Sequence, residues 1–395
     1  MKPRRHVIGS EAVQSVRRRG MNSIEILPGD IVTPEARDQA ERLGIQLLDG
    51  PVPVPAAMRI EGAVALQRGL WRRSPRWMTP THRCNPKATR FGRIAFIGTG
   101  GVGSNAAHLC ANADMADELV LIDVTPGLAA ATALDLNHAA GITRSCCRAR
   151  GGTALSLVEG ADIVLVTAGR ARTPGMTRAD LIDINRRVIH AAGEAIAAHA
   201  PNAIVIVVTN PLDEMTFEML RATGFPRERV LGMAGTLDSS RFRNALAMAA
   251  GVKPGDVEAL TLGSHGEEMA PIVSQSRIKG RPLDVFLSLD QIAACVKDAI
   301  TGGGQVVALK KTGSAVIAPA HSSVEVMDHL RGARQGPCPV SVMLRGEYGI
   351  RDVVLGVPCH LGPTGLVRIA ELPLTESEQK LLSAAADAIR KRLGA

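Results

Sequence analysis

Aromatic residues are scarce in this chain: Phe, Trp and Tyr make up 2% of its 395 residues, although 46% of the residues are hydrophobic. The core must therefore be built from aliphatic side chains, and the chain is long enough for two or three domains. The scarcity also argues against nucleic-acid binding, because single strands are held largely by stacking of their bases on aromatic rings.

Long apolar runs, cysteine pairs and a signal segment are also missing. The longest apolar runs, of which Ala203–Val208 is one, have the length of a strand and fall short of the roughly 18 residues of a membrane helix. The seven cysteines contain no C-x-x-C pair, so the sequence predicts neither a disulfide framework nor a metal site. Because the N-terminus has no apolar segment of the signal-peptide kind, we expect a cytoplasmic protein without a membrane span.

Positive charge is concentrated at one end of the chain. Residues 1–90 contain 16 Lys and Arg against 8 Asp and Glu, which accounts for the whole net charge of +8. Residues 91–395 are therefore balanced in charge, and the basic character belongs to an N-terminal extension rather than to the body of the protein.

A glycine-rich turn between two expected strands organises the stretch Phe91–Val124. The first glycine of G-x-G-x-x-G permits a tight turn, the second lets a pyrophosphate approach the backbone, and the third lets the helix pack on the strand. The helix N-terminus favours the phosphate charge. The predicted parts are the strand Arg93–Ile97, Gly98, Gly100, Gly103, the helix Val102–Ala113, the strand Glu118–Ile122 and Asp123.

Asp123 closes the second strand, twenty residues after the last glycine of the motif. Its carboxylate can accept hydrogen bonds from an adenosine ribose, and its charge would repel a 2′-phosphate, which predicts NAD rather than NADP as the cofactor. The alternative is a glycine-rich turn in some other α/β protein.

Strands and helices continue to alternate after this unit, which is typical of a parallel, doubly wound sheet. We expect buried strands at Ala161–Thr167 and Ala203–Val208, joined by a long helix at Asp180–Ala200. Ligands of such sheets collect at the carboxyl ends of the strands. An arginine-rich loop, residues 170–178, and Asn210 both follow such strand ends.

Polar side chains also mark the second half of the chain. On a helix that begins near Leu237, Asp238 and Arg241 are three residues apart and share a face. His265 follows an expected strand at Val257–Leu262. The chain is expected to close with an amphipathic helix at Glu376–Leu393.

These segments together resemble the lactate/malate dehydrogenase family, and most of all its lactate-dehydrogenase-like malate dehydrogenases. The resemblance runs from Phe91 to the C-terminus and rests on the order and spacing of GTGGVG, TAGRARTPGMTRADL, TNPLD, GMAGTLDSSRFR, GSHGEEM and KTGSA. It implies an α/β fold in which an NAD-binding Rossmann domain with a doubly wound parallel sheet precedes an α+β substrate domain. It also implies a homodimer or homotetramer that acts on malate and oxaloacetate.

Oxidation of a 2-hydroxy acid needs a base for the hydroxyl proton, and a histidine suits this role because its pKa lies near neutrality. His265 would be that base, with Asp238 hydrogen-bonded to its other nitrogen. Arg241 would bind the substrate carboxylate with its two-donor fork. Arg178 would polarise the carbonyl oxygen, and Asn210 would hydrogen-bond it. The resemblance implies the same roles at these positions.

Arg172 is expected to select the substrate. In the family an arginine at this position suits a second carboxylate, whereas glutamine or an apolar residue suits lactate. The residue therefore favours malate and oxaloacetate. The alternative is that Arg170 faces the site instead, or that both arginines are solvated.

Other positions are less sharply defined. Asn185 is expected to contact the cofactor ribose, and Asn210 is expected to contact the cofactor as well. Asp238 could merely cap its helix, with Arg241 merely pairing with it. Ser264 stands where the family has a glycine or glutamate, and Glu267 replaces an aspartate common after His-Gly. These departures remove no catalytic group.

Two rival functions remain open from the sequence. The first is a dehydrogenase of lactate or of another 2-hydroxy acid. The second is an NAD-binding assembly protein without turnover.

The extension has features of its own. Thr33 and Pro34 predict a helix start and Gly44 its stop, between strands at Ser23–Leu27 and Ile45–Leu48. The segment GDIVTPEAR resembles an N-terminal segment of bacterial microcompartment enzymes. It implies a docking or encapsulation module, through residues 1–75, for a shell or cargo partner. The alternative is a solvated basic tail.

The sequence thus predicts four parts. They are a small extension module at 1–50, a linker with a short basic amphipathic helix at 51–90, an NAD-binding domain at 91–236 and a catalytic domain at 237–395.

Overall fold

The chain divides into two compact units, Met1–Arg83 and Cys84–Ala395. The computed structural model describes residues 7–18, 20–26, 30–49, 88–170, 178–266, 268–311 and 313–394. The amphipathic helix expected within residues 51–90 lies outside the described residues.

The N-terminal unit repeats one β-α-β pattern twice. Strand β1 pairs in parallel with β3, and β2 pairs in parallel with β4, so corresponding strands of the two repeats lie side by side. Val13, Ala36, Ala40 and Ile45 form its buried core. The elements are β1 (Val7–Ile8), α1 (Ser10–Arg18), β2 (Ser23–Ile26), β3 (Ile31–Val32), α2 (Pro34–Leu43) and β4 (Gln46–Asp49).

The caps of α2 agree with the sequence pattern. Thr33 Oγ1 accepts the backbone N–H of Ala36 at 3.2 Å, and Gly44 adopts a left-handed φ of 65° that closes the helix. The strands β2 and β4 agree with the expected strands, whereas β1, α1 and β3 were not expected from the sequence.

The body contains a sheet whose first half is parallel. Its strand order is β7-β6-β5-β8-β9-β10, which is the doubly wound order expected of a Rossmann domain. The predicted fold class is therefore confirmed. The strands are β5 (Phe91–Ile97), β6 (Ala116–Ile122), β7 (Arg148–Gly152), β8 (Ile163–Val166), β9 (Ile204–Val207) and β10 (Val230–Gly232).

Both faces of this parallel half are covered, because alternate residues of each strand point to opposite sides. Ile94 and Phe96 of β5 pack into one core with α4, α5 and α10. Ala95 and Ile97 pack into another with α6 and α7. The helices are α4 (Gly101–Asn112), α5 (Leu128–Thr143), α6 (Arg178–His199), α7 (Leu212–Thr223) and α10 (Ile317–Leu330).

The second half of the sheet is antiparallel and continues from β10 through β14. Gly232 of β10 pairs with Ser341 of β14, and Gly263 of β11 pairs with Gly356 of β15. The order is β10-β14-β15-β11-β12-β13, and β16 also pairs with β15. The strands are β11 (Val257–Gly263), β12 (Met269–Ile278), β13 (Arg281–Pro282), β14 (Cys338–Arg345), β15 (Arg351–Gly362) and β16 (Gly365–Ile369).

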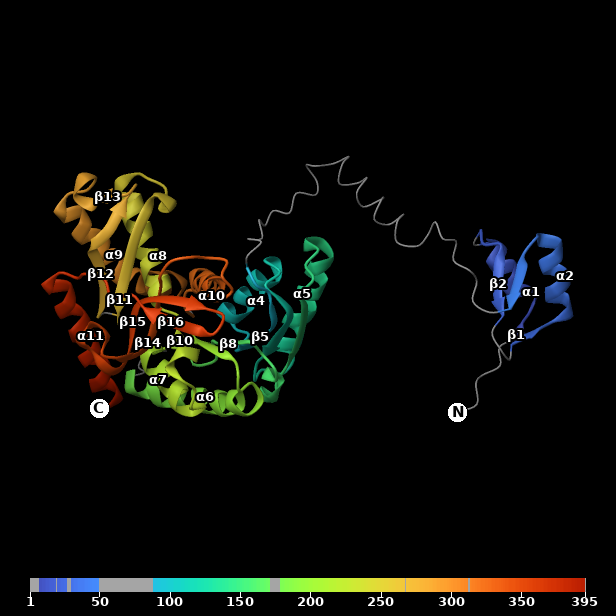
Figure 1. Cartoon of the computed structure of the whole chain (residues 1–395), viewed down its shortest axis with the longest axis horizontal. Helices are drawn as coiled ribbons and strands as arrows, with labels where there is room; N and C mark the ends of the chain where they lie inside the picture. The colour runs from blue at the N-terminus through green and yellow to red at the C-terminus, as the bar shows by residue number, and fades with distance from the viewer. Residues whose placement is uncertain are drawn as a thin grey trace. The chain divides into compact units, whose positions relative to one another are not determined.

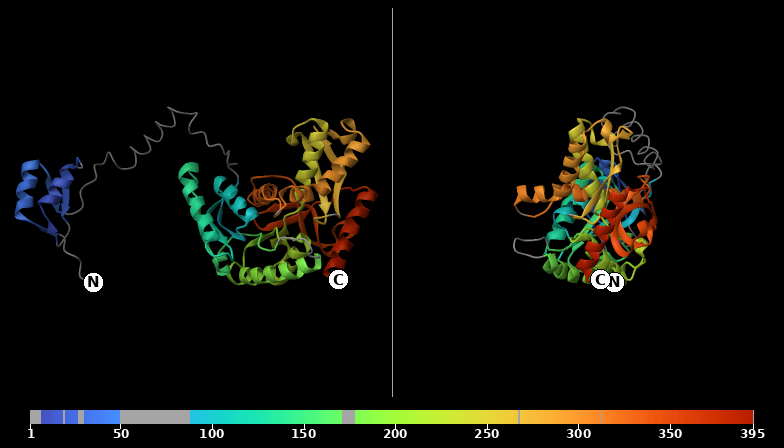
Figure 2. Two further views of the ribbon diagram at one scale, coloured as in Figure 1. Left: turned by 180° about the vertical axis from the view of Figure 1, so that it is seen from behind. Right: turned by 90° about the vertical axis from the view of Figure 1, so that its left-hand side faces the viewer.

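The described part of the body also contains the α-helices α8 (Gly235–Ala250), α9 (Leu289–Lys310) and α11 (Glu376–Leu393). In Figure 1 and in the reverse view of Figure 2, α6 lies below the parallel strands, whereas the yellow-to-orange part of the chain with β12, β13 and α9 rises above them at one end of the sheet. Among the described helices, α9 is long and apolar enough to cross a membrane by length and composition alone. A single helix of this kind is weak evidence for a membrane span. Ile292, Cys295 and Ala299 of α9 are buried in a core shared with α8.

Candidate active site

His265 and Asp238 meet at the junction between the two halves of the sheet. His265 lies in the turn after β11, and Asp238 lies in the first turn of α8. Nδ1 of the imidazole is 2.8 Å from Oδ2 of the carboxylate. Asp238 is almost fully buried, so its charge acts on the imidazole with little screening by water.

This carboxylate controls the protonation of the imidazole. Burial by itself lowers the pKa of His265, but the negative charge of Asp238 and its hydrogen bond outweigh burial, and the pKa is raised above 6.5. The pair therefore favours an imidazolium, which is the form that can give a proton to a developing alkoxide.

Arg241 follows Asp238 by one helical turn on the same face of α8. Its Nη1 donates to Asp238 Oδ1 at 3.0 Å, so Asp238 contacts both a histidine and an arginine. Gly303 of α9 lies close by: a Cβ atom there would be 3.2 Å from Arg241 Nη2. The structure thus brings His265, Asp238 and Arg241 together, as the sequence predicts.

A second buried carboxylate holds the turn that carries the histidine. Asp213, in the first turn of α7, accepts the backbone N–H of His265 at 2.8 Å and the hydroxyl of Ser264 at 3.1 Å. Its other oxygen accepts the hydroxyl of Ser341 at 2.8 Å. Burial, followed by the neighbouring Glu214, raises the pKa of Asp213 to about 6. Asp213 was not expected to have a role, although it lies within the TNPLD motif.

Arg392, near the end of α11, joins the same group of residues. Its guanidinium donates to Glu214 through Nε, to Glu268 Oε1 at 2.8 Å and to Ser264 Oγ at 3.1 Å. Burial lowers the pKa of Arg392, but Glu214 and Glu268 outweigh burial and raise it. The sequence carries no signal for this contact, because 178 residues separate Arg392 from Glu214.

Asn185 and Asn210 lie near the carboxyl ends of β8 and β9. The fully buried Asn185 amide donates to the backbone oxygens of Asn210 at 2.6 Å and of Arg170 at 3.1 Å. Asn185 Oδ1 also accepts the N–H of Arg170 at 2.8 Å. Asn185 thus fixes the first residue of the arginine loop beside Asn210, whose side chain is exposed.

Two predicted arginines are not placed by the structure. Arg172 lies outside the described residues. Arg178 is the first residue of α6, and its side chain also lies outside the described part of the chain.

The glycines after β5 have the close contacts that the motif requires. A Cβ atom at Gly103 would lie 1.9 Å from the carbonyl oxygen of Gly98, so only a glycine lets α4 pack this closely on the turn. Gly98 has φ of 97°, in the left-handed region, and a Cβ there would lie 2.6 Å from the Ala168 nitrogen. Gly100, in contrast, faces open space, because a Cβ atom added there would meet no heavy atom of the described residues within 4 Å.

This open space fits a pyrophosphate. Gly100 caps α4 without a side-chain hydrogen bond, so the N–H groups of the first turn are available to an anion. Thr99 Oγ1 is buried and has no hydrogen-bond partner among the described residues. Asp123 accepts the N–H groups of Thr99 at 2.8 Å and Thr125 at 2.9 Å, which fixes its carboxylate at the end of β6. The turn, the helix end and the acid therefore fit NAD.

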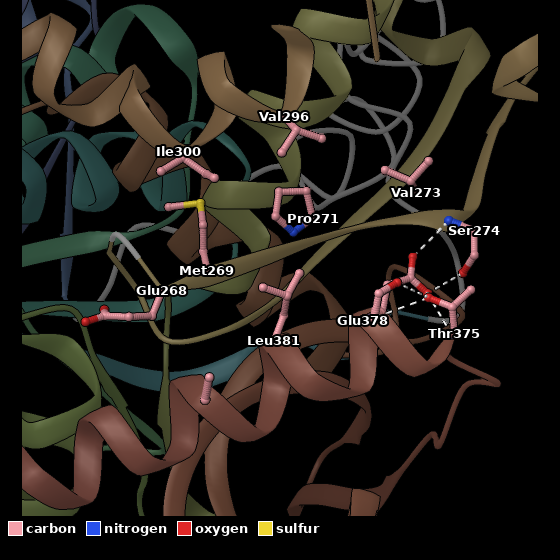
Figure 3. Close-up of a pocket in the computed structure, with 12 residues that line it drawn as sticks. Glu268, Met269, Pro271, Val273, Ser274, Val296, Ile300, Thr375, Glu378 and Leu381 are labelled. Atoms are coloured by element: carbon pink, nitrogen blue, oxygen red, sulfur yellow. Dashed lines mark hydrogen bonds between the residues drawn. The ribbon is translucent and has the colours of Figure 1, made fainter. Parts of the chain in front are cut away.

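An apolar groove of about 720 Å³ lies between β12, α9 and α11, and Glu268 is the residue that it shares with the groups around His265. Figure 3 shows Glu268 at one end of it and Glu378, hydrogen-bonded to Ser274, at the other. Neither His265 nor Asp238 lines the groove. We do not assign the active site to this groove, because His265, whose pKa is shifted, and the glycine turn after β5 do not line it.

Comparisons with known proteins agree with this geometry. The family model described as lactate/malate dehydrogenase, NAD binding domain, matches residues 92–232, and the alpha/beta C-terminal domain of the same family matches residues 235–394. The malate dehydrogenase of Thioalkalivibrio sulfidiphilus is 42% identical over 288 residues, which cover 73% of this chain and 94% of that protein. That of Chloroherpeton thalassium is 41% identical over 299 residues, 76% of this chain and 96% of that protein.

Solved structures give the same result. The malate dehydrogenase of Cryptosporidium parvum is similar with a TM-score of 0.75 and 35% identity, covering 78% of this chain and 98% of that chain. The lactate dehydrogenase of the same organism, complexed with lactic acid and NAD, has a TM-score of 0.74 and 33% identity, covering 77% and 97%. With two family domains matched in succession, a Rossmann strand order and a glycine turn that fits the cofactor, the chain belongs to the lactate/malate dehydrogenase family and uses NAD.

Proposed function

We propose that this protein is an NAD-dependent malate dehydrogenase, which interconverts malate and oxaloacetate. The observation that carries the proposal is the contact between His265 and Asp238, beside the guanidinium of Arg241. The relatives at about 40% identity are named malate dehydrogenases, which favours malate over lactate.

In the proposed mechanism His265 takes the proton of the malate hydroxyl during oxidation and returns it during reduction. Asp238 orients the imidazole through Nδ1 and stabilises the imidazolium, so that Nε2 faces the substrate. NAD, when bound at the glycine turn, supplies the acceptor or donor of the hydride at C2.

Each of the three arginines would bind a different group of the substrate. Arg241 would bind the carboxylate beside the reacting carbon, and Arg172 would bind the far carboxylate. Arg178 and Asn210 would stabilise the charge that develops on the carbonyl oxygen. Asn185 donates a hydrogen bond to the Asn210 carbonyl and would thereby orient Asn210. It would also contact the ribose of the cofactor.

Steady-state kinetics test the substrate. NADH oxidation is measured with oxaloacetate and with pyruvate at equal concentrations, and we expect kcat/KM for oxaloacetate to be larger by about 10²-fold or more, since an unpaired charge in a desolvated site costs several kcal/mol. A preference for pyruvate would make the protein a lactate dehydrogenase instead. His265→Ala with unchanged turnover would favour an NAD-binding assembly protein.

We also propose a homodimer or homotetramer. The second half of α9 is exposed and carries apolar side chains, among them Val307 and Leu309, which are 44% and 84% exposed. Burial of such a patch between copies would remove it from water. Light scattering of the native protein and of Leu309→Lys tests this, and an unchanged monomer in both would contradict it.

For the extension we propose docking to a partner, with a microcompartment shell or cargo protein as the candidate, and otherwise a cytoplasmic location. The small core of its two β-α-β repeats favours a folded module over a solvated tail.

A further inference from the structure

Outside the groups that would touch substrate, a largely buried ionic cluster borders the catalytic histidine. It consists of Glu214 from α7, Ser264 and Glu268 from the turn after β11, and Arg392 from α11. The side chains of Glu214 and Arg392 are 1% and 15% exposed, and that of Glu268 is 32% exposed. Removing these charges from water costs free energy that offsets their mutual attraction, so a gain in stability does not by itself account for the cluster.

Two of the Arg392 donors bind residues on either side of His265 in the turn after β11. Nη2 donates to Ser264, the residue immediately before His265, and Nη1 donates to Glu268, three residues after it. Nε is fixed by Glu214 on the neighbouring helix. One planar guanidinium therefore holds the chain on both sides of the histidine and ties it to α7.

Asp213 completes the support from the same helix. It accepts the N–H of His265 itself and the hydroxyl of Ser264. Ser264 is thus held between Asp213 and Arg392, while the imidazole is held on its other side by Asp238. The second oxygen of Glu268 is buried without a hydrogen-bond partner among the described residues, so Arg392 supplies the counter-charge of this carboxylate.

We propose that Arg392 is a positioning residue for His265: by bridging Ser264 and Glu268 it fixes the turn that presents the imidazole to the substrate. The inference rests on the proposed function, because it needs His265 to be the proton carrier. A misplacement of about 1 Å in a reacting group can cost about 10²-fold in rate. A lysine at position 392 keeps the charge but, as a compact ammonium on a flexible stem, cannot reproduce the planar bridge.

The test uses the full chain and two variants. Arg392→Lys keeps a cation beside Glu214, and the double variant Arg392→Met with Glu214→Gln removes both charges, so that no buried carboxylate on α7 is left without a partner at this position. In each we expect kcat with oxaloacetate to fall about tenfold or more. The affinity for NADH, measured by fluorescence, should stay within about twofold.

A deuterium isotope effect separates positioning from stability. With NADH deuterated at the transferred position, we expect a larger effect on kcat in both variants, because the chemical step becomes slower relative to product release. The matched control is Arg390→Lys, since Arg390 lies on the same helix but pairs with Asp387 and the Arg351 carbonyl. It should leave kcat and the isotope effect unchanged.

Either variant, folded by circular dichroism and with the kcat and isotope effect of the native protein, would overturn the inference. His265→Asn is measured in parallel. If it retains turnover, the proposed function itself fails; if it is inactive while the Arg392 variants are normal, only the positioning role fails.

Discussion

Nδ1 of His265 lies 2.8 Å from Oδ2 of Asp238, although 27 residues separate the two in the chain. The helix α8 and the strand β11 bring them together, and Arg241 binds the other oxygen of the same carboxylate. The carboxylate is therefore already oriented before any substrate enters, which is the preorganisation that proton transfer requires.

Asp238→Asn should lower kcat for oxaloacetate reduction by about 10²-fold or more, which is the usual contribution of a positioned acid or base. An amide cannot stabilise the imidazolium, and it can hold the ring in the wrong tautomer. Initial rates with saturating NADH measure the loss. Asp387→Asn on the surface of α11 is the control, and equal rates in both variants would refute the role.

Oxaloacetate reduction and malate oxidation should depend on pH in opposite ways. Because the pKa of His265 is raised above 6.5, reduction, which uses the imidazolium, should stay active at neutral pH and decline as pH rises through this pKa. Malate oxidation, which uses the neutral ring, should increase over the same range. In profiles of kcat/KM, Asp238→Asn should shift both midpoints to lower pH; unmoved midpoints would mean that another group titrates.

Arg172→Gln should reduce kcat/KM for oxaloacetate by about a hundredfold to several thousandfold, because loss of a buried ion-pair partner costs about 3–5 kcal/mol and each 1.4 kcal/mol is tenfold. Activity with pyruvate should fall much less or rise. Arg170→Gln is the matched control, because the exposed side chain of Arg170 is the alternative group that could bind the far carboxylate of the substrate. The reverse result would assign that role to Arg170.

Asp123→Ser should relax the choice of cofactor. Removal of the carboxylate removes its repulsion of a 2′-phosphate, so the ratio of kcat/KM for NADPH to that for NADH should rise by about tenfold or more. The comparison is made at fixed oxaloacetate. A constant ratio would show that the fixed carboxylate at the end of β6 does not face the ribose.

Deletion of residues 1–75 should leave kcat and KM close to those of the full chain while it changes location or assembly. The described core of the N-terminal unit is formed by its own residues, Val13, Ala36, Ala40 and Ile45. Kinetics and light scattering of the two forms, with imaging in cells, measure the outcome. A large loss of turnover would place the extension in the active site.

The sequence predicted those helices and strands whose own residues show a clear hydrophobic periodicity or clear helix ends. The helix Glu376–Leu393 agrees with α11 to the residue, and the helix expected at Val102–Ala113 is α4 shifted by one position. The strand β12 was missed because Pro271 and an irregular alternation hide it. The helix α9 was missed because three consecutive glycines interrupt its apolar periodicity.

The site was predictable only where polar residues fall into recognisable motifs, as His265, Asp238 and Arg241 do. Arg392 and Asp213 were not assigned, because buried ion pairs and buried hydrogen bonds have no periodicity and their partners are set by the tertiary fold. Ser264 did stand out as a departure from the family pattern, and the structure gives it two partners, Asp213 and Arg392.

Proton transfer by His265 is the central claim, and the turnover of His265→Asn tests it most directly. The account predicts that this variant binds NADH with native affinity, yet reduces oxaloacetate at least about 10³-fold more slowly than the native protein. Native turnover in a variant that lacks the imidazole would contradict it.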